Sequence, residues 1–277
     1  MAILTLDQAF AGSRPPFRFA KSVTPTLVAG RPTSLWALAG APGAGVFDTT
    51  LNGVVLSSSA GQVLGQLPHV DPGAANSHLF RFSAVSSAQP GVLSLFDRLW
   101  HNGGINATLT TAQAISPPQW PLRNPTNAAN DTPSNSGYGV QLAVEVSAAM
   151  GAGTPTISVS YVNEQNAFGR VATNILATAA SPAGGTVYFL GLQAGDNGVR
   201  SVSSITLSSS WTSGTINLVA YRPIVDLELP AAGVPNAVDA LTSGRPRLYD
   251  GVVPWMVFTP SGTAATNLSG THVETQG

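Results

Sequence analysis

Hydrophobic and polar residues alternate at a period of two through the middle of the chain. In segment 140–146, valine or leucine fills most alternate positions, while Gln141 and Glu145 fall between them. Successive side chains of a strand point to opposite faces, so this pattern predicts a half-buried strand. Segment 156–162 repeats the pattern, and segment 170–176 follows it after a polar stretch. We expect these two segments to pair as antiparallel strands.

Short extended segments separated by glycine-rich turns continue to the end of this region. Further strands are predicted at 186–190, 204–209 and 215–221, with Gly184-Gly185 and Ser213-Gly214 among the turns between them. Many short strands with frequent turn signals are typical of a β-sandwich. We therefore predict a β-sandwich lobe over residues 138–222.

The first half of the chain is less regular but also indicates strands. Segment 91–100 fits both a helical and a strand spacing, and we expect a strand because its surroundings are β-rich. Asn52-Gly53 predicts a two-residue hairpin turn between two of the other candidates. Together these segments predict a β lobe over residues 34–137. The other candidate strands are 34–38, 46–51, 54–58, 79–85 and 107–115.

Proline marks the segments that we expect to be irregular. Segment 116–136 holds five prolines and many asparagines, and each proline removes a backbone donor from a ladder. It predicts a Pro/Asn-rich connection that ends the first lobe. Residues 1–33 and 223–277 are predicted as extended terminal segments. The expected fold is mainly β: an antiparallel, jelly-roll-like β-sandwich of two lobes with extended arms.

The N-terminal segment has residues suited to contact a partner. In the run Arg14-Pro15-Pro16-Phe17-Arg18-Phe19, the prolines favour an extended backbone. Phe17 and Phe19 then present apolar groups on one side, while Arg14 and Arg18 can pair with acids. We predict Arg14, Phe17, Arg18 and Phe19 as partner contacts. The alternative is that Phe17 and Phe19 complete the core of this chain.

Charge is scarce, which changes the expected surface. Charged residues make up 9% of the chain and Lys21 is the single lysine, whereas soluble domains carry roughly a quarter charged residues. Protein interfaces are depleted in lysine and acids, so this composition favours surfaces buried against partners. Codon bias toward arginine, alanine, glycine and proline is the other explanation. With a net charge of −1 and scattered basic residues, we expect no direct binding of nucleic acid.

Other function classes lack their sequence patterns. No run of eighteen apolar residues predicts a membrane span, and without cysteine there is no thiolate metal site. His69-Val70-Asp71 is a close histidine–carboxylate pair between two prolines, and Asp97 with His101 would align only on a helix. We predict no catalytic, cofactor-binding or metal site. Two acids far apart in sequence leave a β-fold glycan hydrolase open.

Three segments resemble uncharacterised virion structural proteins of tailed bacteriophages, of the head-decoration or minor capsid type. They are Phe96-Asp97-Arg98-Leu99-Trp100-His101, Thr110-Thr111-Ala112-Gln113 and the run 192–202, LQAGDNGVRSV. The similarity extends from about Ser34 to Tyr221. It implies a virion location and a structural role on the head, as decoration or cement, or else on the tail.

The expected function is therefore a non-enzymatic structural subunit of the virion. Its expected partners are other virion proteins, the major capsid protein first, and copies of itself, with a trimer as one closed arrangement. A tail or fibre subunit that binds a host receptor is the alternative, and the β-fold glycan hydrolase is the second.

Overall fold

The computed structural model describes residues 3, 5–23, 27–73, 75–242, 244 and 247–277. About 45% of the chain lies in strands and 2% in helix, and the sheets are antiparallel. The mainly β prediction is therefore confirmed, including a strand over residues 91–100. Within the described residues, no helix is long and apolar enough to cross a membrane.

The chain forms two units, each with its own hydrophobic core. Unit 1 combines three stretches, 1–46, 57–97 and 224–277, and unit 2 combines 47–56 with 98–223. The two-lobed prediction is confirmed, but the predicted boundaries were wrong. Segments that we expected to be terminal arms are parts of unit 1.

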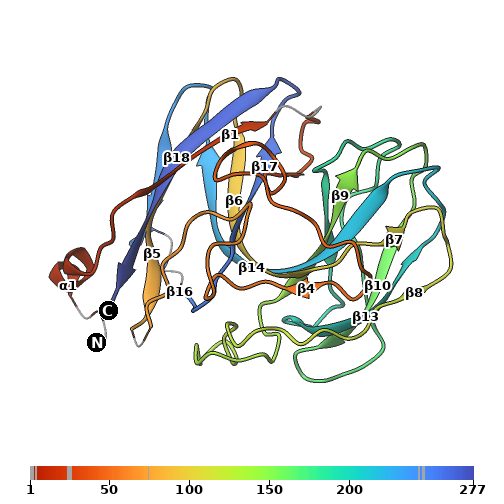
Figure 1. Cartoon of the computed structure of the whole chain (residues 1–277), viewed down its shortest axis with the longest axis horizontal. Helices are drawn as coiled ribbons and strands as arrows, with labels where there is room; N and C mark the ends of the chain where they lie inside the picture. The colour runs from red at the N-terminus through yellow and green to blue at the C-terminus, as the bar shows by residue number, and fades with distance from the viewer. Residues whose placement is uncertain (1–2, 4, 24–26, 74, 243, 245–246) are drawn as a thin grey trace. The chain divides into compact units, whose positions relative to one another are not determined.

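Unit 1 is built on the pairing of its first and last long strands. β1 (Phe17–Val23) pairs antiparallel with β18 (Thr266–Gln276), and Figure 1 shows the two side by side. β18 pairs in turn with β5 (Ser77–Ser86), and β15 (Asn236–Asp239) lies beyond β5. The other elements of unit 1 are α1 (Leu6–Ala11), β2 (Thr33–Ser34), β3 (Gly40–Ala41), the first part of β6 (Gly91–His101), the last part of β14 (Thr215–Leu229), β16 (Arg247–Leu248) and β17 (Pro254–Pro260).

The core of unit 1 lies between two layers of strands. Phe19 and Phe82 stack at a centroid distance of 5.9 Å, and both contribute to a cluster with Leu93, Leu95 and Phe258 from β6 and β17. Alternating burial along β1 sends Phe19, Lys21 and Val23 inward. The N-terminal segment thus completes its own chain's core, which was the alternative interpretation.

Unit 2 is a sheet that curls around a second core. Its strands run in the order β14, β9, β12, β11, β10, β13 and β8. β10 pairs antiparallel with β11, as the sequence predicted. The strands not yet given bounds are β4 (Val54–Val55), β7 (Ile105–Asn106), β8 (Gln113–Ala114), β9 (Gln141–Ala148), β10 (Ile157–Asn163), β11 (Arg170–Asn174), β12 (Val187–Gly191) and β13 (Val199–Leu207).

The Pro/Asn-rich segment 116–136 is irregular, as predicted, but it lies within unit 2 and ends no lobe. Trp120 is buried, and its Nε1 donates to the carbonyl oxygen of Val199 at 2.6 Å. Arg123 is also buried and donates to the carbonyl oxygens of Leu56 and Arg98. These long-range bonds fix the segment to unit 2.

Several predicted strands differ in the structure. Residues 46–51 form no strand, so Asn52-Gly53 joins no hairpin, and β4 pairs with β6 instead. In the C-terminal segment, β17 carries its prolines at its two ends, where they interrupt few ladder bonds. The sequence did not predict β18, because several of its buried residues are polar: His272, Glu274 and Thr275.

We predict that Phe19→Ala lowers the free energy of unfolding by about 3 to 5 kcal/mol, the usual cost of removing a fully buried phenylalanine. Urea denaturation followed by tryptophan fluorescence measures it. Arg18→Ala, an exposed neighbour on the same strand, is the control and should change stability by about 0.5 kcal/mol or less. Equal stability of Phe19→Ala and the wild type would contradict the placement of β1 in the core.

Candidate functional site

The segments that carry the phage resemblance contain buried polar groups. Arg98 and Glu145 form an ion pair at 2.7 Å with both side chains fully buried. Arg98 Nε also donates to Nδ1 of His101 at 2.9 Å. Burial and the nearby guanidinium lower the pKa of His101 to about 2, so its ring is neutral and can accept this bond. These groups join β6 to β9.

Asp97 and His101 do not form the pair considered from sequence. They lie on the strand β6, where Asp97 Oδ1 accepts from the backbone N–H of Val253 at 3.0 Å. His101 interacts with Arg98 instead. The pairing required a helix, and the segment is a strand.

The two other segments that carry the resemblance, 110–113 and 192–202, also bond to neighbouring parts of the chain. Gln113 is buried, and its side-chain amide exchanges two bonds with the backbone of Asn106, at 2.8 and 2.9 Å. Asp196 accepts from the Tyr161 hydroxyl at 2.5 Å and from Asn163 at 2.7 Å. Burial and the bond to Asp196 raise the pKa of Tyr161 to about 12, which keeps its hydroxyl a donor.

A histidine–carboxylate cluster lies in unit 1. His69 Nδ1 is 2.8 Å from Glu274 Oε1, and His272 Nε2 is 3.3 Å from the same oxygen. Asp71 lies 3.1 Å from the other ring nitrogen of His69. The sequence indicated the His69–Asp71 pair, but it gave no signal that Glu274, 205 residues from His69, would join it.

The electrostatics of this cluster favour an ionised glutamate. Burial raises the pKa of Glu274, but the bonds to His272 and His69 outweigh it and lower that pKa to about 2. Nearby, burial and the Asp71 carboxylate raise the pKa of Asp250. Among the described residues, no group of three or more histidines and acids has a geometry that could hold a metal ion.

The four predicted partner contacts have different surroundings. Phe19 is 2% exposed, so it cannot contact a partner, and that prediction was wrong. Phe17 is partly buried and stacks on His272 at 5.1 Å. Arg14 Nε donates to the side chain of Gln276 at 3.0 Å. Arg18 alone of the four is exposed with a side chain that makes no hydrogen bond or ion pair within the described residues.

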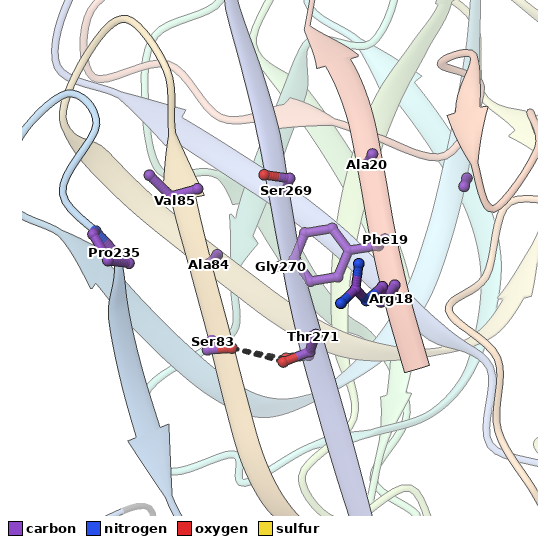
Figure 2. A pocket seen from close by; sticks show the side chains of 11 residues that line it. Arg18, Phe19, Ala20, Ser83, Ala84, Val85, Pro235, Ser269, Gly270 and Thr271 are labelled. Carbon is purple, nitrogen blue, oxygen red and sulfur yellow. Dashed lines mark hydrogen bonds between the residues drawn. The ribbon is translucent and has the colours of Figure 1, made fainter. Parts of the chain in front are cut away.

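Arg18 borders a hollow of about 400 Å³ on the outer face of the β1–β18–β5 sheet. Figure 2 shows this hollow, with the short side chains of Ala20 and Ser269 and the backbone of Gly270 and Ala84. Ser83 and Thr271 bond across it at 2.8 Å between their hydroxyl oxygens. Ala20 and Ser269 are paired outward-facing residues with short side chains, and this leaves the hollow open.

Gly270 is required at the centre of this hollow. A Cβ there would lie 2.0 Å from the Ser83 carbonyl oxygen and 2.7 Å from Phe19 Cζ. The ring of Phe19 lies across Gly270, as Figure 2 shows, and covers the glycine backbone on its buried side. An aromatic ring over a strand glycine compensates for the missing side chain.

A second hollow of about 380 Å³ shares Ala20 and Ser269 with the first. We call the two together the outer trough. Lys21 borders it, but this side chain is buried and its Nζ donates to the carbonyl oxygens of Leu38 and Gly43. Burial lowers the pKa of Lys21 to about 8. Arg18 is therefore the outward-facing charge of the outer trough.

Comparison with known proteins finds little. No family model matches the chain, and no curated protein matches it. Two solved structures of infectious bursal disease virus, of its Gt strain and of its VP2 subviral particle, each give a TM-score of 0.20 at 7% identity. Each alignment covers 95% of this chain and 80% of the other. At this TM-score the similarity supports no argument about function.

We predict that Arg98→Met and Glu145→Gln each destabilise the protein by about 3 to 5 kcal/mol, because each leaves the other charged group buried without its partner. Chemical denaturation of the two single variants and the double variant completes a mutant cycle. The double variant should lose less than the sum of the two single losses. Additive losses would show that the two residues do not interact.

A second prediction concerns Glu274 and pH. Because its folded pKa is depressed, its stabilisation is complete above about pH 4.5 and disappears as the pH falls toward 2. Glu274→Gln should lose roughly 3 kcal/mol at pH 7 and match the wild type more closely near pH 2. Urea denaturation across this range measures both. Glu228→Gln, an exposed acid of β14, should follow the wild-type curve.

Proposed function

We propose that this chain is a non-enzymatic structural subunit of a tailed-bacteriophage virion, of the capsid-decoration, cement or minor head type. The observation that carries the proposal is the role of the three resembling segments. Arg98, Gln113 and Asp196 each bond within the chain and hold strands or loops together. Residues that specify a rigid β scaffold are what an assembly subunit needs.

The outer trough supports a contact with a neighbouring subunit. Its exposed residues are small and uncharged apart from Arg18, and interface cores are depleted in lysine and acids while arginine is enriched. The neighbour that we propose is the major capsid protein, through an extended segment with an acidic residue opposite Arg18. A carboxylate can bind a guanidinium through two parallel hydrogen bonds. Many such contacts on one particle would add up through multivalency.

The competing functions have different support. A tail or fibre subunit that binds a receptor would need a ligand groove, and unit 2 has a groove lined by Trp120, Phe168 and Arg200 among others. For a β-fold hydrolase, the buried acids Glu145, Glu274 and Asp196 are already engaged by residues of this chain. The engaged acids favour the structural role over the hydrolase, and receptor binding is the second candidate function.

The test is incorporation into particles. We predict that Ala20→Glu keeps wild-type thermal stability, because Ala20 points outward, and that its binding falls about tenfold or more, because the larger side chain fills the trough and its carboxylate competes for Arg18. Purified protein is mixed with particles of the phage that encodes it, lacking this subunit, and bound protein is measured by co-sedimentation. Ala265→Glu, an exposed alanine in the turn before β18, is the matched control.

The outcomes separate two ideas. If the wild-type protein fails to sediment with the particles, the virion role is wrong. If it sediments and Ala20→Glu binds equally well, the virion role stands but the outer trough is not the contact. Sedimentation velocity of the free protein separately tests the expected self-association, for which a trimer is one closed arrangement.

A further inference from the structure

Unit 2 contains a groove of about 350 Å³ whose residues take no part in the proposed assembly contact. Trp120 and Tyr161, two buried residues of the unit 2 core, are among the residues that line it. The run 117–119 and Phe168, in the connection between β10 and β11, also line it. Phe168 is 76% exposed, so an aromatic ring stands in solvent at the groove's border.

Several residues that line this groove are fixed by hydrogen bonds within the chain. The Tyr161 hydroxyl donates to Asp196, and Trp120 Nε1 donates to the Val199 carbonyl oxygen. Ser201 Oγ donates to the carbonyl oxygen of Pro118 at 3.0 Å, which ties two lining residues together. Ligand sites are commonly concave, largely preformed and apolar, with a few polar groups that set orientation.

The polar groups at the border are exposed and available. Arg200, Gln119, Asn135 and Asn166 all line the groove, and within the described part of the chain none of their side chains makes a hydrogen bond or an ion pair. Three are amides, which donate and accept at once, and Arg200 is the one charged residue among those that line the groove.

We propose that this groove binds a saccharide that carries a carboxylate. Sugar hydroxyls donate and accept, so they match the amides of Gln119, Asn135 and Asn166. The apolar C–H face of a sugar ring can pack on Phe168, and a carboxylate can form paired, charge-assisted bonds with Arg200. Saccharide binding would be a second property beside the proposed structural role, and it can be measured on the purified chain without particles.

Two other ligand classes fit the groove less well. Nucleic acid needs several cations along its backbone, and the groove has one. A peptide that adds a strand needs an open sheet edge, whereas the two strands that line the groove, β10 and β13, are hydrogen-bonded to each other. An acidic saccharide satisfies both the single charge and the three amides.

The experiment measures binding of a defined disaccharide to the purified full chain. The probe is glucuronic acid linked to N-acetylglucosamine, and its comparison is the same disaccharide with the carboxyl group reduced to an alcohol. Saturation-transfer NMR detects contact, and calorimetry gives the affinity. We expect saturable binding of the acid and roughly tenfold or greater weakening for the reduced sugar, from loss of the charged bonds.

Variants locate the site. Arg200→Gln should weaken binding of the acidic sugar by a similar factor but leave the reduced sugar unchanged, and Phe168→Ala should weaken both. Both residues are exposed, so circular dichroism should show unchanged folding. Arg81→Gln, an exposed arginine of unit 1, is the matched control and should bind like the wild type.

Other outcomes would overturn the proposal. These are no saturable binding of either sugar at millimolar concentration, equal binding of both, or wild-type affinity in Arg200→Gln. A tetraglutamate peptide that binds more tightly than the acidic disaccharide would assign the groove to acidic peptides instead. None of these results bears on incorporation into particles, so the two proposals can fail separately.

Discussion

Unit 1 depends on one pairing, that of β1 with β18. The two strands run antiparallel over seven residues, from Phe17 opposite His272 to Val23 opposite Thr266. That register sets Phe19 over Gly270 and against Phe82, so it positions the centre of the core. It also sets the small outward-facing residues side by side, which creates the outer trough. One ladder therefore determines both the stability of unit 1 and the shape of its open face.

Buried polar groups also hold together segments that are far apart in the sequence. In unit 2, Arg98 on β6 meets Glu145 on β9, and in unit 1 Glu274 on β18 meets His69 in a loop. A buried charge without its partner is costly, so each pair penalises any arrangement in which its elements fail to meet. A chain with few charged residues thus uses several of them to specify which segments lie together.

Local patterns predicted the positions of β9 and β10 well, and β10 alternates between buried and partly exposed residues as expected. The half-buried prediction for β9 was wrong, because Ala143 and Glu145 on its second face are also buried. Local patterns missed β18, where the buried positions include His272 and Glu274. The lobe boundary at 116–136 was misplaced because proline content describes the backbone, while Trp120 and Arg123 are held by distant carbonyl groups. The sequence indicated the His69–Asp71 pair of the histidine–carboxylate cluster, and it indicated Arg18 of the outer trough. It could not indicate Glu274 or the groove beside Phe168, because both arise from contacts between segments far apart in the chain.

The distance in sequence between β1 and β18 has a consequence for synthesis. Ribosomes add about 5 to 20 residues per second, so β1 waits roughly 10 to 50 s after its own synthesis before residue 276 is made. Throughout that interval β1 lacks β18, the longer of its two partners, and only the short pairing with β3 is available to it. Residues 98–223 of unit 2 are complete earlier and can fold while β1 still waits. A chain interrupted before β18 would have a folded unit 2 but no outer trough, and so would lack the face that we propose as a contact. The outer trough is thereby a property that appears only after β18 has been made.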